Sequence, residues 1–181
     1  NESGPQYLRD PLQEGYLITP TRGLIQKYNG RALVITTGAC AINCRYCFRR
    51  HFPYGDNNPS SSDWAGIYQR LTSDASISEV ILSGGDPLIL GDRQLSDIIA
   101  KLDSIETVNT IRLHTRLPIA IPQRICPQLL DWVNQCRKKV VFVLHTNHPS
   151  EIDDHVVDAV RALRDAGATL LNQSVLLRDV N

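Results

Sequence analysis

The chain has 181 residues, of which 42% are hydrophobic, so it is long enough to bury a sizeable core and is not a disordered polypeptide. Lysine plus arginine and aspartate plus glutamate number 19 each, so no net charge draws the chain to nucleic acid or to an anionic membrane surface. No run approaches the roughly 20 apolar residues of a membrane-spanning helix, and the polar first residues lack the layout of a secretion signal. We therefore expect a globular, cytoplasmic protein without nucleic-acid or membrane partners.

Residues 1–30 contain Asp10-Pro11 and Thr19-Pro20, which interrupt helices, so we expect an extended lead-in there and regular structure from Arg31 onward. From that point short β-branched runs alternate with amphipathic segments, which is typical of βα units on a parallel sheet. The predicted strands are Ala32–Thr37, Glu79–Ser83, Thr110–Thr115, Val140–His145 and Thr169–Leu176. The predicted helices are at about 63–72, 93–103, 127–138 and 151–166.

The last helix has the clearest ends, because Ser150 and Asp153 have the spacing of a capping box and Gly167 stands where a helix stops. The pattern gives an α/β fold with about five βα units, either a doubly wound sheet or part of a (β/α) barrel. Both folds collect ligands at the carboxyl ends of the strands, and polar motifs lie at or just after the ends of four predicted strands and within the fifth. These motifs are Cys40, Gly84-Gly85-Asp86, His114 with Arg116, His145, and Asn172-Gln173.

Five cysteines, three of them within eight positions, suit metal ligation in a reducing compartment better than a set of disulfides. Cys40, Cys44 and Cys47 have the spacing C-x3-C-x2-C on a loop after a strand, and three thiolates can hold three irons of a [4Fe–4S] cluster. The fourth iron then stays open to a ligand. The alternative is a zinc site with His51 as the fourth ligand. Two other cysteines beside a helical segment, Cys126 and Cys136, are predicted to be core thiols.

The loop Ser83-Gly84-Gly85-Asp86-Pro87 follows an apolar strand, and its paired glycines allow the backbone to come close to a ligand. Taken alone it could be a plain turn. One βα unit after a cysteine loop, it resembles the loop of radical S-adenosylmethionine enzymes that binds the cofactor's amino group.

Three segments in order, 44–52, 83–88 and 172–178, together resemble the lysine 2,3-aminomutase family of radical S-adenosylmethionine enzymes. The resemblance runs from about Asp10 to the end, and the run Cys-Phe-Arg-Arg-His-Phe-Pro-Tyr is similar to the branch that supplies (R)-β-lysine for modification of elongation factor P. It implies an isomerase that converts L-lysine to (R)-β-lysine, with a partial (β/α) barrel. The implied cofactors are a [4Fe–4S] cluster, S-adenosylmethionine and pyridoxal 5′-phosphate.

By the same resemblance, Arg49 matches the arginine that pairs with the lysine carboxylate, a task suited to a two-pronged donor. The remaining matches concern cofactors: His145 and Gln173 line the S-adenosylmethionine pocket with Ser83, Gly84, Gly85 and Asp86, and Lys27, Tyr28 and Arg31 approach the pyridoxal phosphate. The family has an arginine where this chain has Lys27, and a solvated Arg49-Arg50 pair is the alternative at the carboxylate position. His114, Arg116 and His148 are expected only near the site.

The family's pyridoxal-binding lysine and the aspartates for the substrate ammonium match nothing before Asn181, and the chain contains no methionine. We therefore expect 31–181 to be a radical S-adenosylmethionine core that continues in a longer protein, and these residues alone to be inactive. Expected partners are L-lysine, an electron donor such as flavodoxin or ferredoxin, and a pathway link to elongation factor P; a homo-oligomer is compatible with the sequence. A radical enzyme without pyridoxal phosphate and a zinc-stabilised binding module remain as alternatives.

Overall fold

The computed structural model describes Pro11, Glu14 and residues 19–181. Its centre is one six-stranded sheet whose strands lie side by side in the order of the sequence, β1 to β6. The first pair is antiparallel and every later pair is parallel. The strands are β1 Leu24–Tyr28, β2 Arg31–Thr37, β3 Glu79–Gly84, β4 Thr110–Thr115, β5 Lys139–Leu144 and β6 Thr169–Asn172.

The sequential strand order decides between the two α/β folds that the sequence allowed. A doubly wound sheet reverses its strand order near the middle, whereas a (β/α) barrel adds each strand beside the last. The parallel strands β2 to β6 follow the barrel order, which confirms the prediction of a partial (β/α) barrel with about five βα units.

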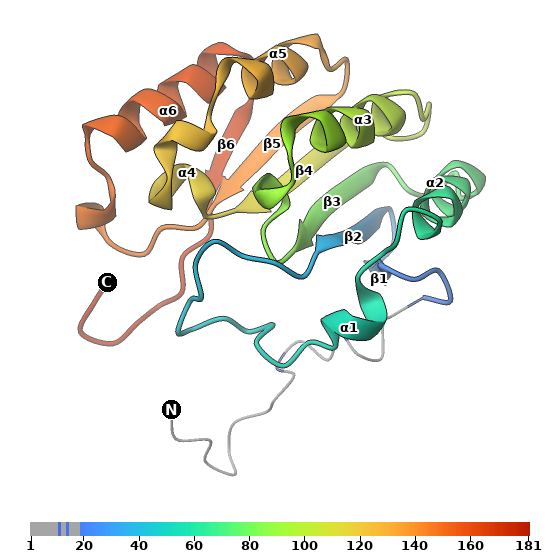
Figure 1. Ribbon diagram of the computed structural model, residues 1–181, viewed down its shortest axis with the longest axis horizontal. Helices are drawn as coiled ribbons and strands as arrows, with labels where there is room; N and C mark the ends of the chain where they lie inside the picture. Colours follow the sequence, from blue (N-terminus) through green and yellow to red (C-terminus); the bar gives the residue numbers. More distant parts are fainter. Residues whose placement is uncertain (1–10, 12–13, 15–18) are drawn as a thin grey trace.

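The helices that follow residue 60 cover one face of this sheet, whereas the short helix before it lies on the side of the cysteine loop (Figure 1). The α-helices are α1 Tyr54–Asn57, α2 Asp63–Ser73, α3 Asp92–Asp103, α4 Leu117–Ala120, α5 Pro127–Gln135 and α6 Asp154–Asp165, with short 3-10 turns η2 Pro87–Ile89, η3 Pro122–Arg124 and η4 Pro149–Glu151. No helix in the described part of the chain has the length and apolar character that crossing a bilayer requires.

The core forms because alternate strand residues point to opposite faces of the sheet. Val34, Leu82, Ile111 and Phe142 face the helices and are fully buried. Burial of such side chains stabilises the fold by roughly 1.5–3 kcal/mol each. The residues between them point to the other face, where the candidate site lies.

Regular structure begins earlier than expected, because β1 occupies part of the predicted lead-in and pairs with β2. A tight turn joins the two strands, and Gly30 in it has a φ of +80°, which glycine adopts at little cost. The Gly30 carbonyl accepts hydrogen bonds from the backbone N–H groups of Ser78 and Glu79, which tie the turn to the start of β3.

Three predicted elements are shorter in the structure. Helix α5 ends at Gln135 and not near residue 138, and side-chain hydrogen bonds account for the changed ends of the other two. Strand β6 ends at Asn172, because the Asn172 amide and the Ser174 hydroxyl both donate to the Thr146 carbonyl. Helix α6 begins at Asp154, and its cap is Asp153, whose carboxylate accepts from Val156 N at 2.9 Å. The residues before it form the separate turn η4, closed by a capping box of His148 and Glu151, so the predicted pairing of Ser150 with Asp153 is wrong. Gly167 follows the helix with a φ of +99°, as expected.

Candidate active site

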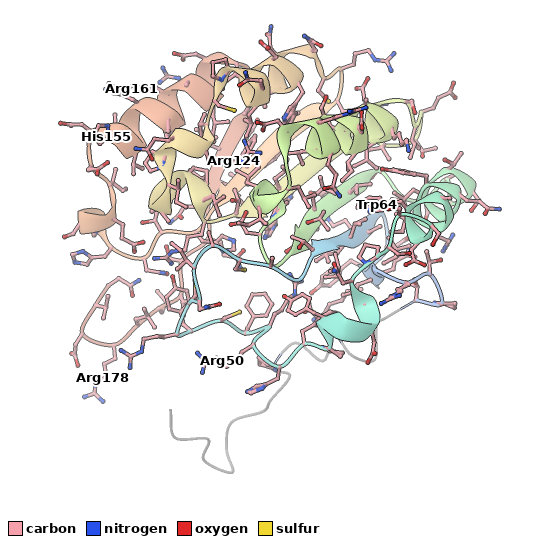
Figure 2. The ribbon with its side chains drawn as sticks, in the orientation of Figure 1. Arg50, Trp64, Arg124, His155, Arg161 and Arg178 are labelled. Atoms are coloured by element: carbon pink, nitrogen blue, oxygen red, sulfur yellow. The ribbon has the colours of Figure 1, made fainter. Side chains whose placement is uncertain are left out.

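The three clustered cysteines lie on the long loop between β2 and α1, which runs beyond the carboxyl edge of the sheet (Figure 1). Cys47 N donates to the Cys44 carbonyl at 3.2 Å, and Arg50 Nη2 donates to the Arg45 carbonyl at 2.6 Å. Arg50, drawn in Figure 2, therefore folds back onto the cysteine loop. Cys40 and Cys47 are exposed and Cys44 is partly buried, and all three are free thiols.

A cavity of about 750 Å³ opens between this loop and the strand ends. Sequence positions far apart meet in it, as expected for the carboxyl edge of a parallel sheet. It is lined by ten of the predicted site residues, namely Cys40, Cys44, Cys47, Arg49, Ser83, Gly84, Gly85, Asp86, His145 and Gln173. His114 and Arg116, which the sequence placed only near the site, also line it.

The donor set of the cysteine loop fits a [4Fe–4S] cluster that keeps one iron open. Burial, together with repulsion by the negative charges of the neighbouring Asp86, Cys47 and Cys44, raises the pKa of Cys40 to about 11. A bound cationic cluster would relieve this repulsion. Among the described residues no three Cys, His, Asp or Glu side chains converge on one metal position.

The glycine pair Gly84-Gly85 at the end of β3 is required by contact with the cysteine loop. Gly84 has a φ of +119°, and a Cβ atom on Gly85 would lie 2.0 Å from the carbonyl oxygen of Ala39. Two hydrogen bonds join the loops, from Gly85 N to the Thr37 carbonyl at 2.7 Å and from Asp86 N to the Ala39 carbonyl at 2.9 Å. The glycines therefore let the protein's own backbone come close, and at the same place they line the cavity.

The Asp86 side chain is buried and joins the ends of two strands. Its carboxylate accepts from Leu88 N at 3.0 Å, from the Thr115 hydroxyl at 2.7 Å and from Arg116 N at 2.8 Å. Burial raises the pKa of Asp86, and these hydrogen bonds act in the opposite direction. Because a carboxylate has about four acceptor positions, the side chain serves mainly to fix the loop.

Two neutral histidines stand next to each other in the cavity wall. The ring centroids of His114 and His145 are 5.8 Å apart with perpendicular planes. Burial lowers the pKa of His114 to about 3, with further contributions from His145, Arg112 and Arg49. Burial and the charges of Arg116 and Arg49 lower the pKa of His145 to about 4. The buried Nε2 of His145 has no hydrogen-bond partner among the described residues, so it is available to a ligand such as S-adenosylmethionine.

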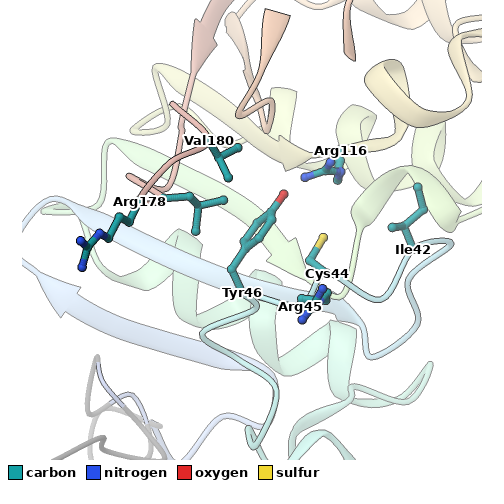
Figure 3. A pocket seen from close by; sticks show the side chains of 8 residues that line it. Ile42, Cys44, Arg45, Tyr46, Arg116, Arg178 and Val180 are labelled. Carbon is teal, nitrogen blue, oxygen red and sulfur yellow. The ribbon is translucent and has the colours of Figure 1, made fainter. Parts of the chain in front are cut away.

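A second, more open hollow of about 590 Å³ borders the cysteine loop (Figure 3). Tyr46 stands in it beside Cys44 and Arg116, and the Arg116 guanidinium lies 5.5 Å from the centre of the Tyr46 ring. Asn147 donates to the Tyr46 hydroxyl, and its own side-chain oxygen accepts from Val175 N. Tyr46 thus connects the cysteine loop to the segment after β6.

Several residues that hold the site were not selected from the sequence. Tyr54 donates from its hydroxyl to the Gly84 carbonyl at 2.6 Å, and Glu14 forms an ion pair with Arg49. Tyr46 and Tyr54 lie within the motif around the cysteines, which was a usable signal. No comparable signal marks Glu14, Thr115 or Asn147.

Three predicted residues lie away from the cavity. Lys27 and Tyr28 end β1 and Arg31 begins β2, so they stand at the opposite end of the sheet, one seven-residue strand or roughly 20 Å from the cysteine loop. The Arg31 guanidinium pairs with Glu79 at 2.7 Å, and Lys27 Nζ lies 5.7 Å from the centre of the Tyr28 ring. None of the three is among the described residues that line the cavity.

Comparison with known proteins agrees with this geometry. The model of a family described as a 4Fe-4S single cluster domain matches residues 29–117, which include the cysteine loop and the glycine pair. A protein of Escherichia coli (strain K12) named L-lysine 2,3-aminomutase is 43% identical over 177 residues, which are 98% of this chain and 51% of that protein. The protein of the same name from Haemophilus influenzae is 43% identical over 95% of this chain and 51% of its own length. That from Clostridium subterminale is 41% identical over 96% of this chain and 42% of its own length.

The chain thus spans about half the length of the curated relatives that it matches. Within that half, the similarity extends over the cysteine loop, the glycine pair and the strand ends around the cavity. Over the half of those proteins that it spans, the chain is similar to the L-lysine 2,3-aminomutases, and its cysteine loop lies in the part that matches a 4Fe-4S single cluster domain.

Proposed function

We propose that this chain is the cluster-binding part of an L-lysine 2,3-aminomutase, an isomerase that converts L-lysine to (R)-β-lysine. The observation that carries the proposal is the meeting of Cys40, Cys44 and Cys47 with His145 and Gln173 around one cavity. Relatives named for this activity, at 34–43% identity, support it. The 4Fe-4S family match favours the cluster over the zinc alternative.

In this proposal the three cysteines ligate three irons, and the cavity beside them receives S-adenosylmethionine. The glycine pair brings the backbone of the two loops together at the cavity wall. His145 offers its unpaired Nε2, and Gln173 holds His114 by a hydrogen bond. Both rings stay neutral at pH 7, so they bind as polar groups without adding positive charge next to a sulfonium cofactor.

Arg49 is the residue proposed to receive the lysine carboxylate, and it lines the same cavity. Pyridoxal 5′-phosphate would approach the other end of the sheet, near Lys27, Tyr28 and Arg31. When bound, the cluster and S-adenosylmethionine supply a carbon radical that abstracts hydrogen, and pyridoxal phosphate supports migration of the amino group. The protein contributes placement, because two loops and five strand ends surround the cavity that is proposed for the cluster, S-adenosylmethionine and the lysine carboxylate.

The finer assignments follow the resemblance to the branch that acts with elongation factor P. We place the product, (R)-β-lysine, in the modification of that factor and the reducing electron with a flavodoxin or ferredoxin. Five free cysteines suit the reducing cytoplasm.

The test uses the complete enzyme, reconstituted anaerobically with iron, sulfide and pyridoxal phosphate. With dithionite, S-adenosylmethionine and L-lysine, we expect 5′-deoxyadenosine and (R)-β-lysine, both measured by mass spectrometry. Formation of 5′-deoxyadenosine without β-lysine would support a radical enzyme of another reaction class. The absence of both from an enzyme with a full cluster would refute the proposal.

A further inference from the structure

Arg49 is held by three short hydrogen bonds inside the protein. Its Nε and Nη2 donate to the two carboxylate oxygens of Glu14, each at 2.7 Å, and its Nη1 donates to the Ser83 hydroxyl at 2.6 Å. Both charged side chains are only 8% exposed. This is the two-pronged arginine–carboxylate geometry that fixes a guanidinium most firmly.

The two partners of Arg49 differ in their position relative to the cavity. Arg49 and Ser83 line it, whereas Glu14 is not among the described residues of its wall. Glu14 therefore binds the guanidinium from outside the cavity and does not occupy the space of a ligand. The Phe48 ring, 5.0 Å from the guanidinium carbon, supports the side chain further.

The donor count leaves room for a ligand. A guanidinium has five N–H groups, and Glu14 and Ser83 use three, so two remain. A buried arginine without a partner is costly and would turn toward solvent. The ion pair removes that cost before any ligand arrives and holds Arg49 where it lines the cavity.

We infer that Glu14 is a positioning residue: it orients Arg49 so that the two remaining N–H groups receive the carboxylate of an amino-acid substrate. The inference rests on the proposed function, in which Arg49 binds the lysine carboxylate. Glu14 does not touch the substrate and acts only through Arg49. Without Glu14, each binding event would have to order the long arginine side chain, which weakens the carboxylate contact by about tenfold.

The experiment compares L-lysine with L-lysinamide, which lacks the carboxylate, by binding calorimetry on the complete enzyme with its cofactors. No reductant is added, so no turnover occurs. Glu14→Gln should bind L-lysine about tenfold more weakly than the parent and bind L-lysinamide equally well. Ser83→Ala removes one contact without leaving a buried charge, and a loss of about two- to threefold is expected. The exposed Glu106→Gln is the matched control and should change neither affinity.

Iron content equal to that of the parent shows that each variant has folded. If Glu14→Gln does not fold, Glu14→Asp takes its place: it keeps the charge but draws the carboxylate back by one methylene group, so it should also weaken binding of L-lysine and not of L-lysinamide. Arg49→Lys separates the two hypotheses. If Arg49→Lys loses affinity for L-lysine and Glu14→Gln does not, the positioning role of Glu14 is overturned while the proposed function stands. The same holds if Glu14→Gln binds L-lysine more tightly than the parent. If Glu14→Gln weakens both ligands equally, the effect is general and the positioning role is again overturned. If Arg49→Lys leaves the preference for the carboxylate unchanged, Arg49 does not hold the substrate and both assignments fail.

Discussion

His114 at the end of β4 and His145 just after β5 share one wall of the cavity. Burial and nearby arginines lower both pKa values far below the ordinary 6.5 of histidine. In the unfolded chain these histidines bind a proton as the pH falls below 6.5. In the folded chain they stay unprotonated until the pH reaches about 4. Each histidine makes the folded state lose stability as the pH falls through this range, and neither affects stability above it.

This effect can be measured by urea unfolding at pH 7.5 and pH 5.5. Each histidine should contribute roughly 1 kcal/mol to the loss of unfolding free energy between these pH values. His114→Gln should reduce that loss by about this amount, because glutamine does not titrate. His155, on the outer surface of α6 (Figure 2), provides the control His155→Gln, which should leave the loss unchanged. An equal pH dependence in parent and His114→Gln would show that His114 protonates in the folded protein.

At the scale of elements, the site depends on the contact between two loops, one after β2 and one after β3. The contact consists of backbone hydrogen bonds and of a glycine with no room for a side chain. Ala39, which would meet the Cβ atom, is the neighbour of Cys40. A change at Gly85 should therefore act on the cluster ligands as well as on any cofactor in the cavity.

We predict that Gly85→Ala impairs cluster binding. The added methyl group would lie 2.0 Å from a backbone atom, so the cysteine loop must shift, at a cost of about 1–3 kcal/mol. Gly91→Ala is a matched control in the connection between β3 and α3, because nothing lies within 4 Å of its added Cβ atom. After anaerobic reconstitution Gly85→Ala should hold several-fold less iron than Gly91→Ala. Equal iron contents would mean that the loop contact does not position the cysteines.

The elements differ in how far the sequence could predict them, for physical reasons. Strands β2 to β5 were predicted nearly to the residue, because short β-branched runs, which supply the buried face of the sheet, alternate with segments of helical length. Strand β1 was missed because only its first two residues are buried, and its pairing with β2 is a tertiary contact. Strand β6 was predicted too long because apolar residues continue after Asn172, where side-chain hydrogen bonds turn the chain.

At the scale of the whole molecule, a sheet wound in barrel order brings residues from 40 to 173 into one cavity. The sequence predicted this gathering because motifs followed strand after strand at the edge where parallel strands collect ligands. It did not predict the Glu14–Arg49 pair, which joins positions 35 residues apart and has no motif. Sequence also could not show that the Asp86 carboxylate is occupied by hydrogen bonds from the next strand end.

The central claim is that Cys40, Cys44 and Cys47 together hold a [4Fe–4S] cluster. The most direct measurement is iron and sulfide analysis after anaerobic reconstitution of the parent and of single cysteine-to-alanine variants. The parent should hold about four irons and four sulfides per chain. Alanine at Cys40, Cys44 or Cys47 should each abolish stable binding. Cys126 and Cys136, which flank α5 and donate to Asp92 and Asp103, are the controls, and their alanine variants should keep the cluster. A full cluster in Cys44→Ala, or its loss in Cys136→Ala, would contradict the assignment.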